Sequence, residues 1–412
     1  MQIAHKIELR PNNKQKTYFG KACGTARFAY NWGLAEWTRL YEENKKLPEQ
    51  DRMKISGMAL KKAFNAIKKE QFPWTKEVTK YAAQQPFLDL QDAFGRFFQK
   101  KGGRPTFKKK GKSRESFYVG GDQVRMEGKK IHVPNLGLVR LKEPLRFTGK
   151  INSAVFSKVA DKWFVSVQVK TRGLGYEAPQ EDRQIGVDIG IESMAVISDG
   201  YRFESPLPLK KHLRRLRRSQ RVLSKRCRAS KESGKKLSDA KNVQKQRMKV
   251  ARIHNKISCI RKDILHKVTS FLACNYTAIA IEDLNVKGMV KNHNLARSIQ
   301  DVGFGEFRRQ LVYKTAWRQT NLILVDRFFP SSKACSQCHA MKDAMPLSER
   351  VFECACGFKA NRDFNASLNL VKQIGRVPAE STPVEITALR RSVYPVVVSS
   401  IVESGNKHQI FA

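Results

Sequence analysis

Three acidic side chains lie at the edges of strongly apolar segments, and this placement constrains the fold more than any other feature of the chain. Asp188 follows an apolar strand in Ile185-Gly186-Val187-Asp188-Ile189-Gly190, and Glu282 ends a second one in Ala278-Ile279-Ala280-Ile281-Glu282. Asp363 lies near the start of a predicted helix. A carboxylate in such surroundings is costly unless a cation or another charge compensates it. Each acid alone could be exposed or cap a helix, but together they favour one shared site.

Converging carboxylates suit the hydrolysis of phosphodiester bonds. Two Mg²⁺ or Mn²⁺ ions can hold the attacking water and the leaving oxygen, and both ions prefer hard oxygen ligands. Asp188, Glu282 and Asp363 are therefore the candidate catalytic residues and the candidate magnesium ligands. Asp283 is the alternative to Glu282. Because neighbouring side chains of a strand point to opposite faces, only one of the two can join the cluster.

Four of the eight cysteines are concentrated in one short segment. Cys335-Ser336-Gln337-Cys338 is followed, after 15 residues, by Cys354-Ala355-Cys356-Gly357. Two close thiol pairs on separate turns are what tetrahedral zinc requires, and the metal neutralises the thiolate charge. We therefore expect Cys335, Cys338, Cys354 and Cys356 to bind a structural zinc ion. The second pair is one residue shorter than the first, which leaves His339 as an alternative ligand.

The chain is strongly basic, with 79 Lys and Arg against 37 Asp and Glu and a formal net charge of +42. Folding does not require such an excess, so the charge indicates a polyanionic partner, and nucleic acid fits best. Between Pro206 and Lys262 the chain holds 21 Lys or Arg and two acids, Glu232 and Asp239. A merely solvated helix face would carry Glu partners at i,i+4 spacing. Because these are nearly missing, we predict a surface that follows phosphates.

Hydrophobic patterning predicts the order of structural elements. The first ten residues alternate as a strand does, and residues 14 to 100 show helical spacing, with Pro86 expected to kink one helix or to mark its start. Short alternating runs between Ser116 and Lys170 indicate a small antiparallel barrel or sandwich, which the first strand could join. Paired strands are expected at 185–189 and 194–198, followed by two basic helices.

The sequence resembles the TnpB family, the OrfB-type proteins of bacterial insertion sequences that are related to type V CRISPR nucleases. The similarity covers nearly the whole chain. The blocks that carry it are Arg27-Phe28-Ala29-Tyr30-Asn31-Trp32, Gly186-Val187-Asp188-Ile189-Gly190, Ile281-Glu282-Asp283-Leu284, Phe329-Pro330-Ser331-Ser332-Lys333-Ala334-Cys335 and Arg362-Asp363-Phe364-Asn365-Ala366-Ser367. Their order, with a thiol cluster just before the last acid, makes the resemblance specific.

The resemblance implies a multidomain α/β and β protein whose catalytic acids are Asp188, Glu282 and Asp363. The resemblance implies an RNase H-like (RuvC) nuclease domain at 178–330 and 358–378, with an inserted zinc ribbon at 331–357. It also implies a wedge-type β-barrel module at 1–13 and 104–177 and a helical recognition module at 14–103. The remaining residues, 379–412, would form a loosely ordered tail. Asn361 departs from the family pattern, in which Asp is common there.

The resemblance further implies that a guide RNA, derived from the end of the transposable element, directs cleavage of double-stranded DNA beside a short motif that the protein reads. The motif-reading helix corresponds to Thr79 onward. Lys80 and Gln84 lie one turn apart on it and can address base edges, although a solvated helix face is an equal alternative. We expect a cytoplasmic protein, associated with the nucleoid through DNA, because no segment approaches the roughly 18 to 20 apolar residues of a membrane span.

Two alternatives to an RNA-guided endonuclease stay open. A guide-directed, DNA-binding repressor on the same fold would have lost at least one acid, whereas all three are present. A strand-joining transposase uses a similar acid cluster, but it would bind transposon ends through its own domains and would not require a guide RNA.

Overall fold

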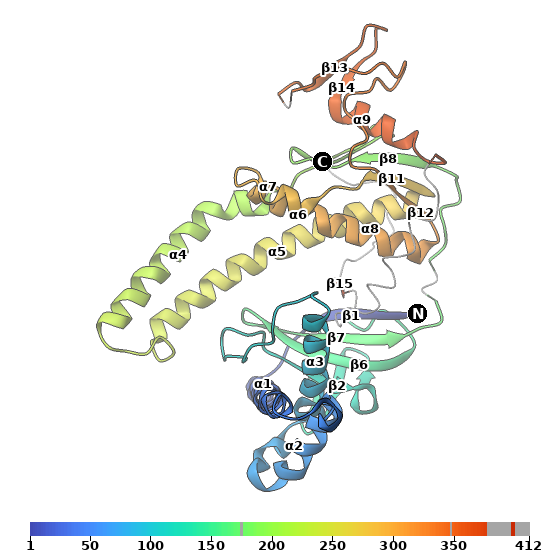
Figure 1. Ribbon diagram of the computed structural model, residues 1–412. Coiled ribbons are helices and arrows are strands. Elements are labelled where there is room, and N and C mark those ends of the chain that lie inside the picture. Colours follow the sequence, from blue (N-terminus) through green and yellow to red (C-terminus); the bar gives the residue numbers. More distant parts are fainter. Residues whose placement is uncertain (174–175, 347, 377–396, 400–412) are drawn as a thin grey trace. The chain divides into compact units, whose positions relative to one another are not determined.

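The computed structural model describes residues 1–412 except 174–175, 347, 377–396 and 400–412 (Figure 1). The chain forms two compact units, one built from residues 1–172 with a short segment around 397–399, the other from residue 173 onward. The predicted tail at 379–412 lies outside the described residues, apart from strand β15 (Val397–Ser399). No described helix is both long enough and apolar enough to cross a membrane.

The first unit contains two β-sheets. A five-stranded sheet has the order β15-β1-β7-β6-β2, with β1 (Gln2–Leu9), β2 (Ser116–Gly120), β6 (Lys150–Val159) and β7 (Lys162–Lys170). A three-stranded sheet contains β3 (Arg125–Glu127), β4 (Lys130–Val133) and β5 (Gly137–Arg140). Strand β1 pairs antiparallel with β7 from Gln2 opposite Lys170 onward, which confirms that the first strand joins the later ones. An isolated bridge between Leu9 and Leu141 links the two sheets.

Three helices complete the first unit: α1 (Asn13–Asn44), α2 (Gly57–Gln71) and α3 (Lys80–Phe98). Helix α1 starts at a capping box formed by Asn12 and Gln15, which satisfies its first N–H groups. Thr79 caps α3, so this helix begins before Pro86 and contains the proline in its interior. Asn31 joins α1 to a later loop, because its side-chain amide pairs with the backbone N–H and carbonyl of Lys108 at 2.8 and 2.9 Å.

The second unit is built on a mixed sheet of order β10-β9-β8-β11-β12. Its strands are β8 (Gln184–Asp188), β9 (Ser193–Ile197), β10 (Arg202–Glu204), β11 (Ala278–Glu282) and β12 (Asn321–Val325). Strands β8 and β9 pair antiparallel, as expected from the sequence, while β11 lies parallel to both β8 and β12. Helices cover both faces of this sheet, which explains why its central strands are continuously apolar.

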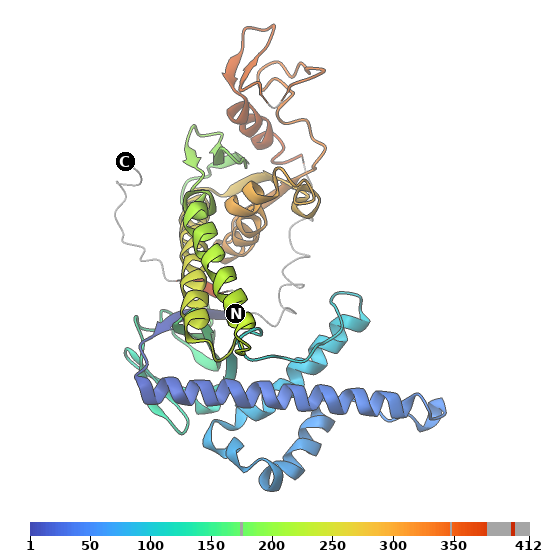
Figure 2. The same cartoon turned by 90° about the vertical axis from the view of Figure 1, so that its left-hand side faces the viewer.

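The helices of the second unit are α4 (Pro208–Glu232), α5 (Lys241–Asn275), α6 (Val286–Met289), α7 (Ala296–Val302), α8 (Phe304–Arg318) and α9 (Arg362–Val371). The two basic helices, α4 and α5, form an antiparallel hairpin that extends from the sheet of this unit (Figures 1 and 2). Leu216 of α4 packs against Ile253 and Ile257 of α5 and leaves the basic side chains outside.

Candidate metal centres

The first two acids lie at the same edge of the second unit's sheet. Strands β8 and β11 are parallel and in register, with Val187 opposite Ile281, so Asp188 and Glu282 follow at the adjacent carboxyl ends. Ala280 packs against Leu370 of α9. Since residues two apart on a strand share a face, Glu282 also faces the side of the sheet that α9 covers.

Helix α9 brings the third acid to this edge, and Gly186 permits its approach. A Cβ atom at position 186 would lie 2.0 Å from the carbonyl oxygen of Ser367 and 2.5 Å from the amide nitrogen of Val371, far inside van der Waals contact. Only glycine therefore fits between β8 and α9 as they stand. Asp188, two residues later, lies on the same face as Gly186 and is directed toward the helix that carries Asp363 in its first turn.

The electrostatics of Asp188 indicate that the three carboxylates interact. Burial raises the pKa of Asp188 well above its usual range, and the neighbouring Glu282 and Asp363 raise it further, while Arg362 acts in the opposite direction. Among the described residues, one group of three or more His, Cys, Asp or Glu side chains is placed to hold a metal ion, and it is the cysteine cluster rather than the three carboxylates. A divalent cation would offset their repulsion.

The structure distinguishes Glu282 from Asp283. Asp283 pairs with Arg308 and, at 2.8 Å, with Arg327, so cations already neutralise it. Glu282 instead accepts a hydrogen bond from the hydroxyl of Ser331. This arrangement favours Glu282 as the acid that joins Asp188. Sequence reasoning did not single out Ser331, whose only signal was its place in the block from Phe329 to Cys335.

The four predicted zinc ligands lie together in the second unit. The sulfur atoms of Cys335, Cys338, Cys354 and Cys356 all fall within 4.8 Å of one another. The second pair is carried by a hairpin of β13 (Val351–Glu353) and β14 (Lys359–Asn361). Two sulfur–sulfur contacts, at 3.7 Å for Cys335 with Cys356 and 3.5 Å for Cys338 with Cys354, each join one thiol from each pair.

The cysteine cluster has the chemistry of a tetrahedral zinc site. Burial acts to raise the pKa of Cys335, but hydrogen bonds from the backbone N–H groups of Cys338 and Gln337, together with those from the thiols of Cys338 and Cys354, lower the pKa to about 7. A thiol with a lowered pKa is more readily present as the thiolate that binds metal. His339 is not part of the cluster; its backbone, at φ +64°, shapes the turn after the first cysteine pair and donates to the carbonyl of Cys335 at 3.0 Å.

Two buried asparagines attach α9 to the chain around the first cysteine pair. The amide of Asn365 donates to the carbonyl of Ala334 at 2.8 Å and accepts from the N–H of Ser336 at 3.0 Å, while Asn369 donates to the carbonyl of Ser331 at 2.8 Å. These contacts were not anticipated from sequence. Asn361 caps α9 by accepting from the N–H groups of Asp363 and Phe364, so it provides the helix cap that an aspartate could also provide.

Lys80 and Gln84 are one turn apart at the start of α3 in the first unit. Lys80 is half-exposed, and its ammonium lies 3.3 Å from a carboxylate oxygen of Asp122. Gln84 is partly buried. Their role in reading DNA stays a prediction.

Sequence comparisons match three segments of the chain to family profiles. Residues 164–293 match OrfB_IS605, described as "Probable transposase", and residues 304–370 match a profile described as "Cas12f1-like, TNB domain". Residues 1–46 match a profile described as "Helix-turn-helix domain". In the structure this last segment forms strand β1 and a single helix of 32 residues, α1.

Two relatives are similar to the chain over most of its length. A protein of Escherichia coli (strain K12), named "Putative RNA-guided DNA endonuclease InsQ", is 31% identical over 384 residues, which cover 89% of this chain and 91% of the relative. A protein of Streptomyces pristinaespiralis, named "Putative RNA-guided DNA endonuclease", is 31% identical over 373 residues, or 89% and 88% of the two chains. Among solved structures, the cryo-EM structure of the Cas12f1-sgRNA-target DNA complex aligns with a TM-score of 0.49 and 15% identity, covering 87% of this chain and 83% of that one.

Proposed function

The chain belongs to the TnpB family of OrfB-type proteins, and on that premise we propose that it is an RNA-guided DNA endonuclease of an IS605-type transposable element. Its partners are a guide RNA from the transposon end and double-stranded DNA that matches the guide. The observation that carries this proposal is the meeting of Asp188, Glu282 and Asp363 at one edge of a buried sheet.

The three acids fit a divalent cation, because carboxylate oxygens are hard ligands and their mutual repulsion needs a compensating charge. Asp188, Glu282 and Asp363 would hold Mg²⁺ or Mn²⁺. Two such ions, when bound, would activate a water molecule and neutralise negative charge on the scissile phosphate. The chain contributes the positioning: β8 and β11 hold two acids in register, α9 presents the third, and Ser331 orients Glu282 through its hydrogen bond.

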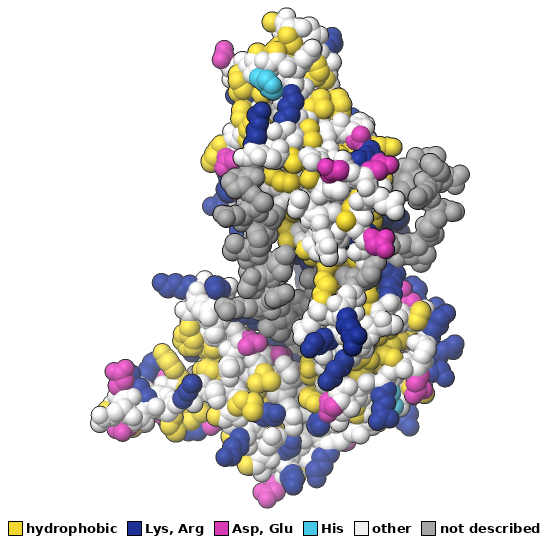
Figure 3. Space-filling view, turned by 90° about the vertical axis from the view of Figure 1, so that its right-hand side faces the viewer, with side chains coloured by type: hydrophobic (Ala, Val, Ile, Leu, Met, Phe, Trp, Pro, Cys, Tyr) yellow, Lys and Arg dark blue, Asp and Glu magenta, His cyan; other side chains and the backbone are white. Residues whose placement is uncertain are grey.

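The hairpin of α4 and α5 supplies a surface for the nucleic acid backbone. Arg214, Arg217 and Arg221 lie on one face of α4, are exposed, and have no ion-pair partner among the residues that the structure describes. Cations without acidic partners are free to bind phosphates, whereas base pairing with the guide supplies the sequence information. On the face of the molecule shown in Figure 3, Lys and Arg side chains likewise exceed Asp and Glu.

The finer organisation follows the family. The nuclease domain is RuvC-like, at 178–330 and 358–378, with a zinc ribbon at 331–357; the wedge module takes 1–13 and 104–177, and the recognition module 14–103. Within the last, Lys80 and Gln84 read the motif beside the target. A zinc ion held by these four thiols would be structural, because they would fill all four tetrahedral positions. Metal analysis should find one zinc per chain, and a Cys338→Ser variant with undiminished zinc content would contradict this assignment.

The experiment that tests the activity compares acid variants with the wild-type chain. The purified protein should carry a defined RNA and cut a guide-matched plasmid only when Mg²⁺ or Mn²⁺ is present. Asp188→Asn and Glu282→Gln should slow cutting by about a thousandfold or more, because several kcal/mol of transition-state stabilisation are lost. Bound RNA should be retained. Glu204→Gln, which removes an exposed acid from the same sheet, serves as the matched control and should cut normally.

Each outcome separates the alternatives. If Asp188→Asn cuts as fast as the wild-type chain, the proposed active centre is wrong. Guide-dependent DNA binding without any cleavage by the wild-type chain would identify a repressor. Joined rather than cut strands, formed without RNA, would identify a transposase.

A further inference from the structure

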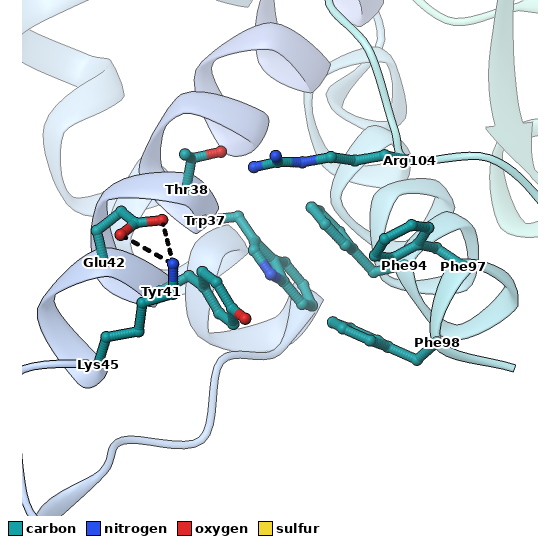
Figure 4. Close-up of a pocket in the computed structure, with 9 residues that line it drawn as sticks. All are labelled: Trp37, Thr38, Tyr41, Glu42, Lys45, Phe94, Phe97, Phe98 and Arg104. Atoms are coloured by element: carbon teal, nitrogen blue, oxygen red, sulfur yellow. Dashed lines mark hydrogen bonds and ion pairs between the residues drawn. The ribbon is translucent and has the colours of Figure 1, made fainter. Parts of the chain in front are cut away.

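A cavity of about 220 Å³ opens between the ends of α1 and α3 in the first unit (Figure 4). Five aromatic side chains line it: Trp37 and Tyr41 from α1, and Phe94, Phe97 and Phe98 from α3. We refer to these five as the aromatic pocket. Three charged side chains lie at the same cavity: Glu42 and Lys45 form an ion pair at 3.0 Å, and Arg104 adds a positive charge that this pair does not compensate.

Three rings of the aromatic pocket form a nearly parallel stack. Trp37 and Phe94 are stacked with their centroids 4.3 Å apart and their planes 11° apart, and Phe98 continues the stack at 6.0 Å and 23° from Phe94. The stack begins in the core, where Trp37 is 6% exposed, and ends in solvent, where Phe98 is 59% exposed. Tyr41 is also exposed, at 41%. The pocket therefore offers open aromatic faces supported by a rigid buried base.

The pocket also contains unsatisfied polar groups. The indole N–H of Trp37 is buried and has no hydrogen-bond partner among the described residues. In Figure 4 this nitrogen lies on the side of the indole that faces Tyr41. A buried donor without an acceptor is costly, and an indole N–H usually finds a partner. The guanidinium of Arg104 is exposed and has no ion-pair partner in the described part of the chain.

We propose that the aromatic pocket binds one unpaired nucleobase of the nucleic acid held by this protein. A planar base would extend the ring stack at Phe98 and Tyr41, and base stacking on aromatic side chains tolerates any base. Arg104 would bind the phosphate that adjoins this base.

The volume of the cavity and the net charge of the chain favour a nucleobase as the occupant. The cavity is smaller than the roughly 300 to 1,000 Å³ of pockets for drug-sized ligands, so one ring system fits better than a whole cofactor. The net charge of +42 favours a polyanion over an apolar peptide. The inference rests on the proposed function only in requiring that the chain binds RNA or DNA.

The test uses the full-length chain in buffer without divalent cations. Single-stranded RNA and DNA oligonucleotides, each carrying one 2-aminopurine, are titrated separately, and quenching reports stacking of that base. Phe98→Ala and Tyr41→Ala should weaken binding by about ten- to a hundredfold without changing its salt dependence, because stacking is worth about 1 to 3 kcal/mol. Arg104→Gln should instead reduce the salt slope by about one. The RNA and DNA arms identify the strand that supplies the base.

Met58→Ala is the matched control, because Met58 lies on α2 of the same unit and is 59% exposed, as Phe98 is. It should bind both oligonucleotides as the wild-type chain does. Melting temperatures of all variants show that they are folded. If Phe98→Ala binds normally, or if Met58→Ala loses as much affinity, the pocket inference is wrong while the proposed function stands.

Two further results would also overturn the inference. If the pocket variants change self-association, measured by light scattering, and leave oligonucleotide binding unchanged, the occupant is a second copy of the chain. If the wild-type chain binds neither oligonucleotide and carries no RNA, the proposed function fails together with the inference.

Discussion

His266 illustrates how one buried side chain can set the acid sensitivity of the second unit. It is 4% exposed on α5, and its pKa is lowered to about 3 by burial first and then by the nearby charge of Lys314. The ammonium of Lys314 donates to the carbonyl of His266 at 2.8 Å and fixes this cation in place. The folded chain therefore holds His266 uncharged over the whole neutral range.

We predict that the free energy of unfolding decreases as the pH falls, because His266 stays uncharged in the folded chain. An unfolded histidine has a pKa near 6.5, so between pH 6.5 and 3 the unfolded chain binds a proton that the folded chain does not. The stabilisation is complete above pH 6.5 and falls by up to about 1.4 kcal/mol for each pH unit below it. Urea unfolding at pH 7, 6 and 5 should show a smaller loss for His266→Gln than for the wild-type chain. His254→Gln, an exposed position on the same helix, should lose stability like the wild type.

Individual site residues differ in how far the sequence could predict them. The position of Asp188 and Glu282 at one edge of the sheet was predictable because each ends an apolar strand, whereas their role as metal ligands stays a prediction. Ser331, Asn365 and Asn369 were not, since each acts through partners distant in sequence that only the folded chain brings near. The tight contact at Gly186 likewise depends on a helix nearly 180 residues later in the chain.

At the scale of elements, the base of the α4–α5 hairpin depends on one acid in another helix. Helix α4 follows Leu207, which has a left-handed backbone and provides no side-chain cap. Asp301 of α7, 2% exposed, caps α4 instead by accepting from the N–H groups of Leu209 and Lys210 at 2.9 and 3.0 Å. It also pairs with Arg261 of α5 at 3.0 Å. One carboxylate thus holds both arms of the hairpin.

We expect Asp301→Ala to destabilise the second unit by about 3 kcal/mol, because removing one partner of a buried pair leaves the other uncompensated and two helix N–H groups lose their acceptor. Hydrogen exchange at the start of α4 should accelerate. Asp263→Ala, which breaks only the half-exposed i,i+4 pair with Lys267, should cost less than about 1 kcal/mol. Equal effects of the two substitutions would show that Asp301 does not anchor the hairpin.

Element types were predictable where the hydrophobic period was clear. Strand β7 alternates buried and partly exposed residues along its length, and it lies within the region between Ser116 and Lys170 where alternating runs predict strands. The sequence did not decide whether Pro86 starts α3 or lies inside it. In the structure Thr79 caps the helix seven residues earlier, and the burial of Phe87 and Leu90 offsets the cost of a proline inside the helix. Contacts between the two sheets of the first unit, such as the bridge from Leu9 to Leu141, decide how β1 to β7 are arranged. The alternation of apolar and polar residues along each strand does not specify such contacts.

At the scale of the whole molecule, the charge of +42 predicts that nucleic acid binding is steeply sensitive to salt. Each neutralised phosphate contributes a slope of about 0.9 for duplex DNA, so six to ten contacts reduce affinity by about 10³ to 10⁵ between 50 and 200 mM salt. Replacing Arg214, Arg217 and Arg221 by Gln should lower the slope by up to about three and leave the melting temperature unchanged, since the three are exposed. If the affinity for nucleic acid does not depend on salt concentration, the hairpin does not bind phosphates through its charge.

The order of the three acids along the chain also determines when their cluster is completed during synthesis, because α9 comes last. The sheet that carries Asp188 and Glu282 ends with β12 at Val325, before the cysteine segment has been made. Asp363 arrives only on α9, which binds through Asn365 and Asn369 to the chain between Ser331 and Ser336. A nascent chain therefore carries only two of the three acids until the cysteine segment and the start of α9 have been synthesised.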